Sequence, residues 1–235
     1  MSRSLLAAAG AALLAAQASA QTYSTKCNPS WGNVTCPADA ALGTTFNTTF
    51  TSSMTGLDPT FFNVTAGESL ISFTDAGLEL PILKQGDSVT IQTNFYILWG
   101  SVEVIFQAAK GQGIISTFNM LSDDEDEIDW EIMGGNESYV SNNWYGKGNT
   151  SQHNGEYPAL QGAMDGFHNY TVNWSQDQLQ WILDGNVVRT IPGAGPGEYP
   201  QTPSYLKFGI WAGGDPTLPQ GTIDWAGGKT DYKQG

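Results

Sequence analysis

The sequence predicts a single all-β domain that folds as a sandwich of two antiparallel sheets. The chain has 235 residues, among them 28 glycines and 11 prolines, and it shows little helical periodicity. Short segments of alternating apolar and polar residues are separated by turn residues, a pattern typical of two-sheet β proteins. Residues 21–235 are enough to bury a large core in one domain.

The first twenty residues are expected to be a secretory leader rather than part of the fold. Arg3 precedes an apolar run over 5–16, and the small residues at 18–20 fit a cleavage site. The run is shorter than the roughly 20 strongly apolar residues that a membrane span needs, and no later segment is a candidate. We therefore predict a signal peptide over 1–20, a secreted extracellular protein and no transmembrane segment.

The expected strands follow one another along the mature chain with short turns between them. Asp184, Gly185 and Asn186 give a hairpin signal, because glycine readily adopts the positive φ that tight turns need. The expected strands cover 69–74, 88–98, 101–109, 113–121, 126–133, 139–145, 168–174, 179–184, 187–191, 205–212 and 221–225.

In a secreted protein, cysteines can form disulfides and asparagine sequons can be glycosylated. Cys27 and Cys36 are the only cysteines, and we expect them to form a disulfide that closes a short loop. The chain also contains Asn-x-Ser/Thr sequons, which predict a glycoprotein. The sequons begin at Asn33, Asn47, Asn63, Asn136, Asn149, Asn169 and Asn173.

The segment 126–132 carries acidic residues at alternate positions. On a β-strand, Glu127, Asp129 and Glu131 would share one face, and the apolar residues between them would face the core. Three like charges side by side repel one another, which a purely structural strand has no reason to tolerate. A retaining glycosidase, in contrast, needs one ionised carboxylate and one protonated partner. We therefore predict that these three residues are catalytic.

The acidic residues allow two other interpretations. The run 123–126 is interpreted as a solvated loop, but that explanation fails for 127–132, where every second residue is apolar. A calcium loop of the EF-hand type does not fit either, because its glycine and its last glutamate do not align with these acids. We expect no metal and no cofactor.

Composition excludes several other classes of function. The formal net charge is −14 and no basic stripe is present, so nucleic acid is not an expected partner, whereas neutral polysaccharide is. The two histidines, His153 and His168, give little support to a histidine-based triad or metal cluster, and His168 is interpreted as structural. We expect a monomer.

Six motifs are spread along the mature chain: AAKGQGIIS at 108–116, DEIDWE at 126–131, YGKGN at 145–149, FHNYT at 167–171, WAGGDP at 211–216 and GTIDWAGG at 221–228. With these motifs, nearly the whole mature chain resembles the fungal Crh cell-wall transglycosylases of glycoside hydrolase family 16. The resemblance implies a β-jelly-roll with a concave substrate cleft. It also implies cleavage of β-1,4-linked chitin and transfer of the new end to β-glucan or chitin in the cell wall.

Carried over residue by residue, the resemblance gives each acid a role. Glu127 matches the nucleophile, Glu131 the general acid/base and Asp129 the assisting carboxylate between them. One tension remains, because four residues of flat strand separate the two glutamates by roughly 13 Å between Cα atoms. Retaining enzymes hold their carboxyl groups about 5–5.5 Å apart, so the strand must lie on a curved sheet.

Sugar contacts are expected on the same face as the acids. In the strand over 205–212, Lys207 and Trp211 alternate with the apolar set, so Lys207 would donate to hydroxyls and Trp211 would stack on a pyranose ring. Thr222 resembles a further sugar contact of the family, and Trp225 is another candidate. Trp130 lies between the acids in sequence and is assigned to the core.

The sequence departs from the family in two places, and it leaves alternatives open. Ser101 stands where the family often has a basic residue, and Crh proteins usually continue past Gly235 into another strand, so the resemblance implies a truncated C-terminus. A secreted endo-hydrolase of β-glucan or chitin differs only in the group that resolves the intermediate. A non-catalytic carbohydrate-binding jelly roll is the remaining alternative, although binding alone does not explain three aligned acids.

Overall fold

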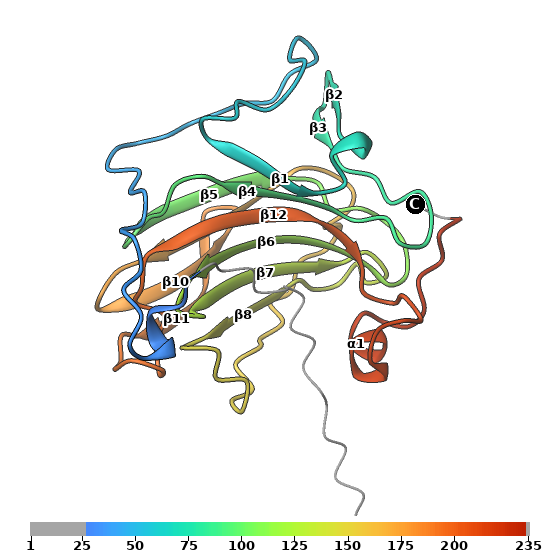
Figure 1. Ribbon diagram of the computed structural model, residues 1–235. Coiled ribbons are helices and arrows are strands. Elements are labelled where there is room, and N and C mark those ends of the chain that lie inside the picture. Colours follow the sequence, from blue (N-terminus) through green and yellow to red (C-terminus); the bar gives the residue numbers. More distant parts are fainter. Residues whose placement is uncertain (1–26, 234–235) are drawn as a thin grey trace, which may run out of the picture.

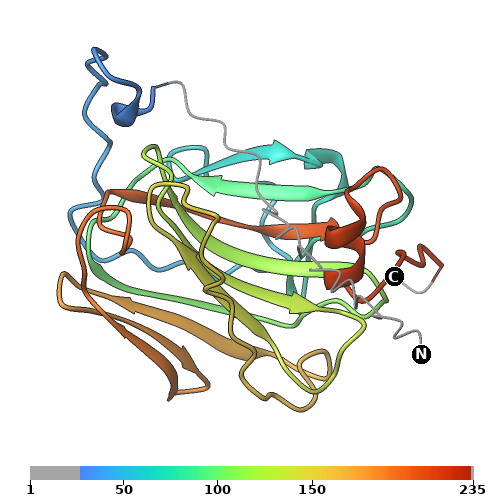
Figure 2. The same cartoon turned by 90° about the horizontal axis from the view of Figure 1, so that it is seen from below.

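The structure is a computed structural model that describes residues 27–233 (Figure 1). The expected signal peptide and cleavage site lie outside these residues. Two antiparallel sheets make up most of the fold, which confirms the predicted all-β sandwich. Figure 2 shows them as separate layers, with the orange strands of the smaller sheet apart from the green strands of the larger one.

The larger sheet has six strands and carries the acidic segment on the strand next to one of its edges. In spatial order its strands are β1 (Phe62–Ala66), β4 (Val89–Thr93), β12 (Ser204–Ala212), β6 (Ile114–Ser122), β7 (Glu127–Met133) and β8 (Ser141–Tyr145). The smaller sheet has four: β11 (Asn186–Pro192), β10 (Gln178–Leu183), β9 (His168–Trp174) and β5 (Gly100–Phe106). A separate ribbon consists of β2 (Ser72–Thr74) and β3 (Gly77–Glu79).

The main core fills the space between the two sheets. Trp130 of β7 packs there with Phe118 of β6, and Tyr170 and Trp181 come from the four-stranded sheet. The Trp130 side chain is fully buried, which confirms its assignment to the core. Because side chains alternate along a strand, burial of Trp130 in this core turns the neighbouring acids to the outer face of the six-stranded sheet.

Most predicted strands are present, with ends that shift by a few residues. The expected strand over 69–74 is wrong in its first half, because η2 (Glu68–Leu70) is a short 3-10 helix that precedes β2. The expected strand over 88–98 ends at Thr93, after which the chain leaves the ladder. Strands β1 and β3 were not predicted.

The expected strand over 221–225 is wrong, because these residues belong to the helix α1 (Gln220–Trp225). In a segment of five residues, alternating apolar positions fit one turn of a helix as well as a strand. Pro219 at the N-cap starts the helix, where its missing N–H is not needed. Thr222 and Ile223 are the buried residues of the helix.

Candidate active site

The three acids lie on one face of β7, as the sequence predicts. Asp129 pairs with Asn119 of β6 and Asn143 of β8, and Asn119 pairs in turn with Lys207 of β12. Directly opposed residues of an antiparallel sheet point to the same face. Lys207 and Asp129 therefore belong to one row across the sheet, which confirms the expected face for Lys207.

The neighbouring rows are built in the same way. Glu131 lies opposite Thr117 of β6 and Ser141 of β8, whereas Glu127 lies opposite Leu121 and Tyr145. The rows that hold Asp129 and Glu131 are therefore polar on both sides. Glu127 has an apolar neighbour on β6 and a phenol on β8.

The strands that carry these rows bend together. Figure 1 shows β12, β6 and β7 bowed in the same direction, with α1 on the inner side of the curve near their right-hand ends. A face on the inner side of a curved sheet brings side chains of the same strand closer together than a flat strand does. A flat strand would hold Glu127 and Glu131 too far apart for a retaining mechanism, so the predicted pairing of their carboxyl groups requires this curvature.

Burial raises the pKa of all three carboxyls. The side chains of Glu127, Asp129 and Glu131 are almost completely buried. Removal from water disfavours the charged form and brings the pKa of Glu127 to about 7 and that of Glu131 to about 8. The pKa of Asp129 lies well above its usual range, first because of burial and then because of the two neighbouring glutamates.

A hydrogen bond separates the roles of two of the acids. The carboxyl groups of Glu127 and Asp129 are hydrogen-bonded to one another, which lowers the pKa of Glu127 and raises that of Asp129. The direction of these two shifts favours Asp129 as the carboxyl that keeps the proton of the pair. The positive charge of Lys207 lowers the pKa of Glu127 further, so Glu127 is the first of the three carboxyls to ionise.

An aromatic group lies beyond the Glu131 end of β7. The rings of Trp211 and Trp225 stack with centroids 6.1 Å apart, and those of Tyr139 and Tyr157 meet edge to face at 5.3 Å. The structure thus brings the predicted residues Trp211 and Trp225 together, because α1 covers this end of the face. Thr222 lies in the same helix but is buried, at 5% exposure.

Sequence reasoning missed the two tyrosines of this group. Tyr139 packs with Trp211 and Trp225 beside buried Met133, the last residue of β7. Tyr157 lies in an irregular segment, where no periodicity relates it to the acids. Its position could be found only from the bridge pairings of that segment with residues 139 and 142.

The run 123–126 is not a solvated loop, so that interpretation is wrong. Asp126 is fully buried and accepts hydrogen bonds from the N–H of Lys147 at 2.8 Å, the N–H of Gln201 at 2.8 Å and the hydroxyl of Thr202 at 2.6 Å. Asp124 forms an ion pair with the ammonium group of Lys147. These acids hold the β6–β7 turn to neighbouring loops and fix the point where the acidic strand starts.

The predicted disulfide between Cys27 and Cys36 is present, and its loop is docked on the same turn. The amide of Asn28 donates to Oε1 of Glu125 at 3.1 Å, and the hydroxyl of Ser30 donates to Asp124. The loop contains the 3-10 turn η1 (Pro29–Trp31). Figure 1 places η1 at the end of the sheet opposite to α1.

His168, interpreted as structural, lies on β9 of the four-stranded sheet. Its Nδ1 is 2.7 Å from Oδ2 of Asp184, and its Nε2 is 3.3 Å from the carbonyl of Gly162. Ser101 lies on β5 of the same sheet, so neither residue belongs to the face that carries the acids.

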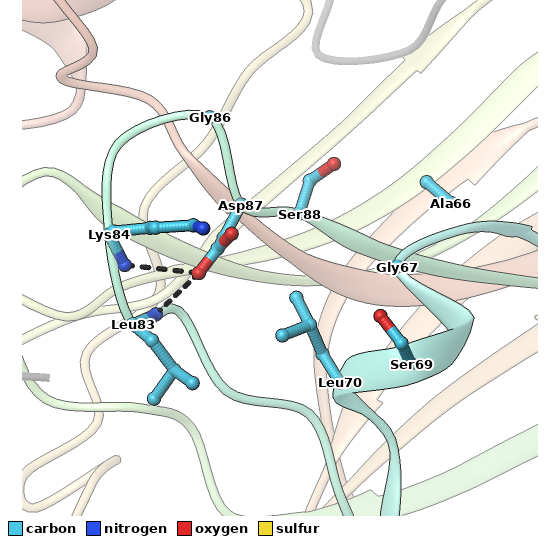
Figure 3. A pocket seen from close by; sticks show the side chains of 9 residues that line it. All are labelled: Ala66, Gly67, Ser69, Leu70, Leu83, Lys84, Gly86, Asp87 and Ser88. Atoms are coloured by element: carbon cyan, nitrogen blue, oxygen red, sulfur yellow. Dashed lines mark hydrogen bonds between the residues drawn. The ribbon is translucent and has the colours of Figure 1, made fainter.

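A surface hollow of about 510 Å³ lies away from the acids, between η2 and the turn that precedes β4. Figure 3 shows the carboxylate of Asp87 directed at the turn, where it accepts from the N–H groups of Leu83 and Lys84 at 3.0 Å each. The carboxylate thus stabilises the turn. None of the predicted site residues lines this hollow.

Within residues 27–233, no group of three or more His, Cys, Asp or Glu side chains is arranged to hold a metal ion. The helices of the same part of the chain are too short and too polar to cross a bilayer.

Comparison with known proteins identifies the family. Residues 59–227 match the model of glycosyl hydrolases family 16. Crh-like protein 2 of Botryotinia fuckeliana is 46% identical over 97% of this chain and 51% of its own length. Crh-like protein 3 of Aspergillus fumigatus is 48% identical over 92% of this chain and 58% of its own length. The chain thus spans about half the length of these curated relatives.

Solved structures agree with the sequence relatives. The apo Crh5 transglycosylase is 42% identical, with a TM-score of 0.80 over 89% of this chain and 85% of its own. The same enzyme in complex with NAG gives a TM-score of 0.78. A Bacillus licheniformis β-glucanase, at 22% identity and a TM-score of 0.62, shares the fold. The β-sandwich with its row of acids, the matched family model and these relatives show that the chain belongs to glycosyl hydrolases family 16 and, within it, to the Crh proteins.

Proposed function

We propose that this protein is a cell-wall transglycosylase that cleaves β-1,4-linked chitin and transfers the new end to β-glucan or chitin. The observation that carries the proposal is the arrangement on β7. There the buried carboxyls of Glu127 and Asp129 form a hydrogen-bonded pair. Glu131 lies next to this pair, and its pKa is higher than that of Glu127. Its relatives are Crh proteins, one of which is a transglycosylase solved with NAG.

The first half of the reaction forms a covalent intermediate. The carboxylate of Glu127 attacks the anomeric carbon of the donor sugar, and a new C–O bond forms as the glycosidic C–O bond breaks. Glu131 gives its proton to the departing oxygen, so the leaving chain departs as an alcohol. The raised pKa of Glu131 supports this role, since an acid must carry its proton when the bond breaks.

In the second half of the reaction Glu131 acts as a base instead of an acid. Glu131, now ionised, takes the proton of an acceptor hydroxyl, and the oxygen of that hydroxyl attacks the anomeric carbon. The bond to Glu127 breaks, and its carboxylate is restored. Two inversions at the same carbon give net retention of the β configuration.

Asp129 assists by holding the proton that Glu127 must not carry. As long as Asp129 is protonated and donates to Glu127, the nucleophile stays ionised beside another acid. When Glu127 bonds to the sugar it loses its negative charge, and the hydrogen bond from Asp129 weakens. Asp129 thus adjusts the basicity of the nucleophile without bonding to the sugar.

Sugar binding is assigned to the same face. Lys207 lies in the row of Asp129 and is placed to donate to hydroxyl groups. The stacked indoles of Trp211 and Trp225 offer apolar surface to a pyranose ring beyond Glu131. Thr222 is buried in α1 and is proposed as a further sugar contact.

The proposed location follows from the substrate. A chitin and β-glucan transglycosylase acts outside the plasma membrane, and a signal peptide over 1–20 with cleavage before Gln21 would export it. The Crh relatives support an association with the cell wall. Sequencing the N-terminus of the secreted protein tests the cleavage site.

The decisive experiment incubates the protein with a chito-oligosaccharide donor and a fluorescent β-glucan oligosaccharide acceptor. We expect labelled hybrid products that grow with acceptor concentration, because a bound acceptor is positioned to outcompete water. Hydrolysis that stays dominant at saturating acceptor would make the protein an endo-hydrolase. Binding of the donor without any cleavage would make it a carbohydrate-binding protein.

A further inference from the structure

The four-stranded sheet reaches across the core to the backbone of the acidic strand. The indole N–H of Trp181, on β10, donates to the main-chain carbonyl of Asp129 at 3.0 Å. Trp181 is fully buried, and its partner is the residue at the centre of the three acids. A carbonyl oxygen has two lone pairs, so it can accept this bond in addition to one from the sheet ladder.

A cation holds the same indole in place from another direction. The guanidinium carbon of Arg189, on β11, lies 4.8 Å from the centroid of the Trp181 ring. Its Nη1 donates to Oδ1 of Asn142 at 2.6 Å, and Asn142 is paired with Trp130 on β7. Arg189 therefore links the indole to β8, the strand that flanks the acids.

We propose that Trp181, held by Arg189, is a positioning residue that fixes the height of Asp129 above the core and so keeps its carboxyl in register with Glu127. This inference rests on the proposed function of the acids. Ladder bonds from β6 and β8 hold β7 within the plane of the sheet, but they resist motion perpendicular to that plane only weakly. The bond from Trp181 comes from the core side and restrains that motion.

The bond from Trp181 does more than satisfy a buried N–H group. Every buried indole N–H needs an acceptor, and Trp174 meets the same need with the carbonyl of Pro200 at 2.9 Å. That bond lies at a loop rather than under an acid. Trp174 is as deeply buried as Trp181, so it provides a matched control.

The test compares Trp181→Phe with Trp174→Phe in the full chain. Each change removes one indole N–H and keeps an aromatic ring, so we expect a similar fall in melting temperature. Only Trp181→Phe should lower kcat, by about tenfold, with the KM for donor unchanged, because small displacements of reacting groups slow the chemical step more than binding.

The pH profile gives a readout that a merely structural role would not move. The groups that face Glu127 are Asp129 and Glu131 on its own strand, Lys207 of β12, Tyr205 of β12 and Tyr145 of β8. Of these, Trp181→Phe disturbs the position of Asp129. A weaker hydrogen bond from Asp129 leaves Glu127 harder to ionise, so the acid limb of kcat/KM should move to higher pH.

The outcomes separate the inference from the function on which it rests. An inactive wild type overturns the proposed function, whereas an active wild type with equal kcat and pH profile in both variants overturns only the positioning role. If Trp181→Phe does not fold, Arg189→Lys replaces it, because it keeps the indole bond but loosens the ring. That variant should show a smaller fall in kcat and the same direction of pH shift, and a wild-type profile would again overturn the inference.

Discussion

Replacement of Glu131 by glutamine should stabilise the fold at alkaline pH while it strongly reduces turnover. In the unfolded chain this carboxyl ionises near 4.5, whereas in the folded protein burial and the charge of Glu127 bring its pKa to about 8. Between these values the folded state keeps a proton that the unfolded state has lost. The wild-type protein must therefore lose stability as pH rises from about 4.5 to about 8.

The size of the effect follows from the same two values. The difference between 4.5 and about 8 corresponds to at most about 5 kcal/mol between the two protonation states. Glutamine has nearly the shape of the neutral acid and never ionises, so Glu131→Gln removes this penalty. For a domain of this length, each kcal/mol shifts the melting temperature by about 2–4 °C.

The assay is thermal unfolding of wild type and Glu131→Gln at a series of pH values from 4 to about 9. We expect the two melting curves to agree at the acidic end and the variant to melt higher at the alkaline end. Turnover should fall by about 10²–10⁴, the usual contribution of general acid/base catalysis. Parallel pH dependence of stability in both proteins would refute the buried, protonated state of Glu131.

Four further predictions concern the rest of the site. Glu127→Ala should be inactive on its own. Azide that enters the vacated space should react with an activated donor to give a glycosyl azide of α configuration, which NMR analysis of the product detects. A β product would place the nucleophile elsewhere. Lys207→Met should move the acid limb of kcat/KM to higher pH, because the lost positive charge favours ionised Glu127; an unmoved limb in a folded variant would remove Lys207 from the site's electrostatics. Trp211→Ala should raise the KM for the donor by about tenfold without unfolding, given the energy of an aromatic platform, and unchanged donor kinetics would return this residue to a packing role. Joint replacement of Cys27 and Cys36 by serine should destabilise the protein by about 2–3 kcal/mol, measured by urea unfolding, and equal midpoints would show that the docked loop is held by its hydrogen bonds alone.

The parts of the fold that were predicted correctly are those with a long alternating pattern. The strands around Trp130 and Lys207 have alternation over seven and nine residues, so both their existence and their faces could be assigned. The strand prediction over 221–225 is wrong because the six residues of the helix are too few to distinguish a helix from a strand by their pattern. In the structure this helix is accompanied by a contact that the sequence does not reveal, the stacking of Trp225 on Trp211.

The site was predicted in the same uneven way. Glu127, Asp129 and Glu131 follow one strand, so a local rule placed them on one face. Tyr157 and the bond from Trp181 to Asp129 depend on pairing between distant segments. Those contacts are fixed by the packing of whole sheets, and no short spacing in the sequence indicates them.

The acidic hairpin contains two kinds of buried carboxyl, and the difference between them argues for catalysis independently of any relative. Asp126 is surrounded by donors, with two backbone N–H groups and a hydroxyl between 2.6 and 2.8 Å from its oxygens. Within residues 27–233, in contrast, Oδ1 of Asp129 and Oε1 of Glu131 are buried and have no hydrogen-bond partner.

An unpaired buried acceptor lowers the stability of the fold by about 1–3 kcal/mol. Two of them on one strand are therefore not expected in a purely structural hairpin. A sugar chain laid across this face would bring hydroxyl groups and a glycosidic oxygen to the unpaired oxygens of Asp129 and Glu131. The fold satisfies the acid that anchors the turn and leaves two carboxyl oxygens of the acidic face without a hydrogen-bond partner. That division of the carboxyls is the arrangement expected of a strand whose outer face is completed by a ligand.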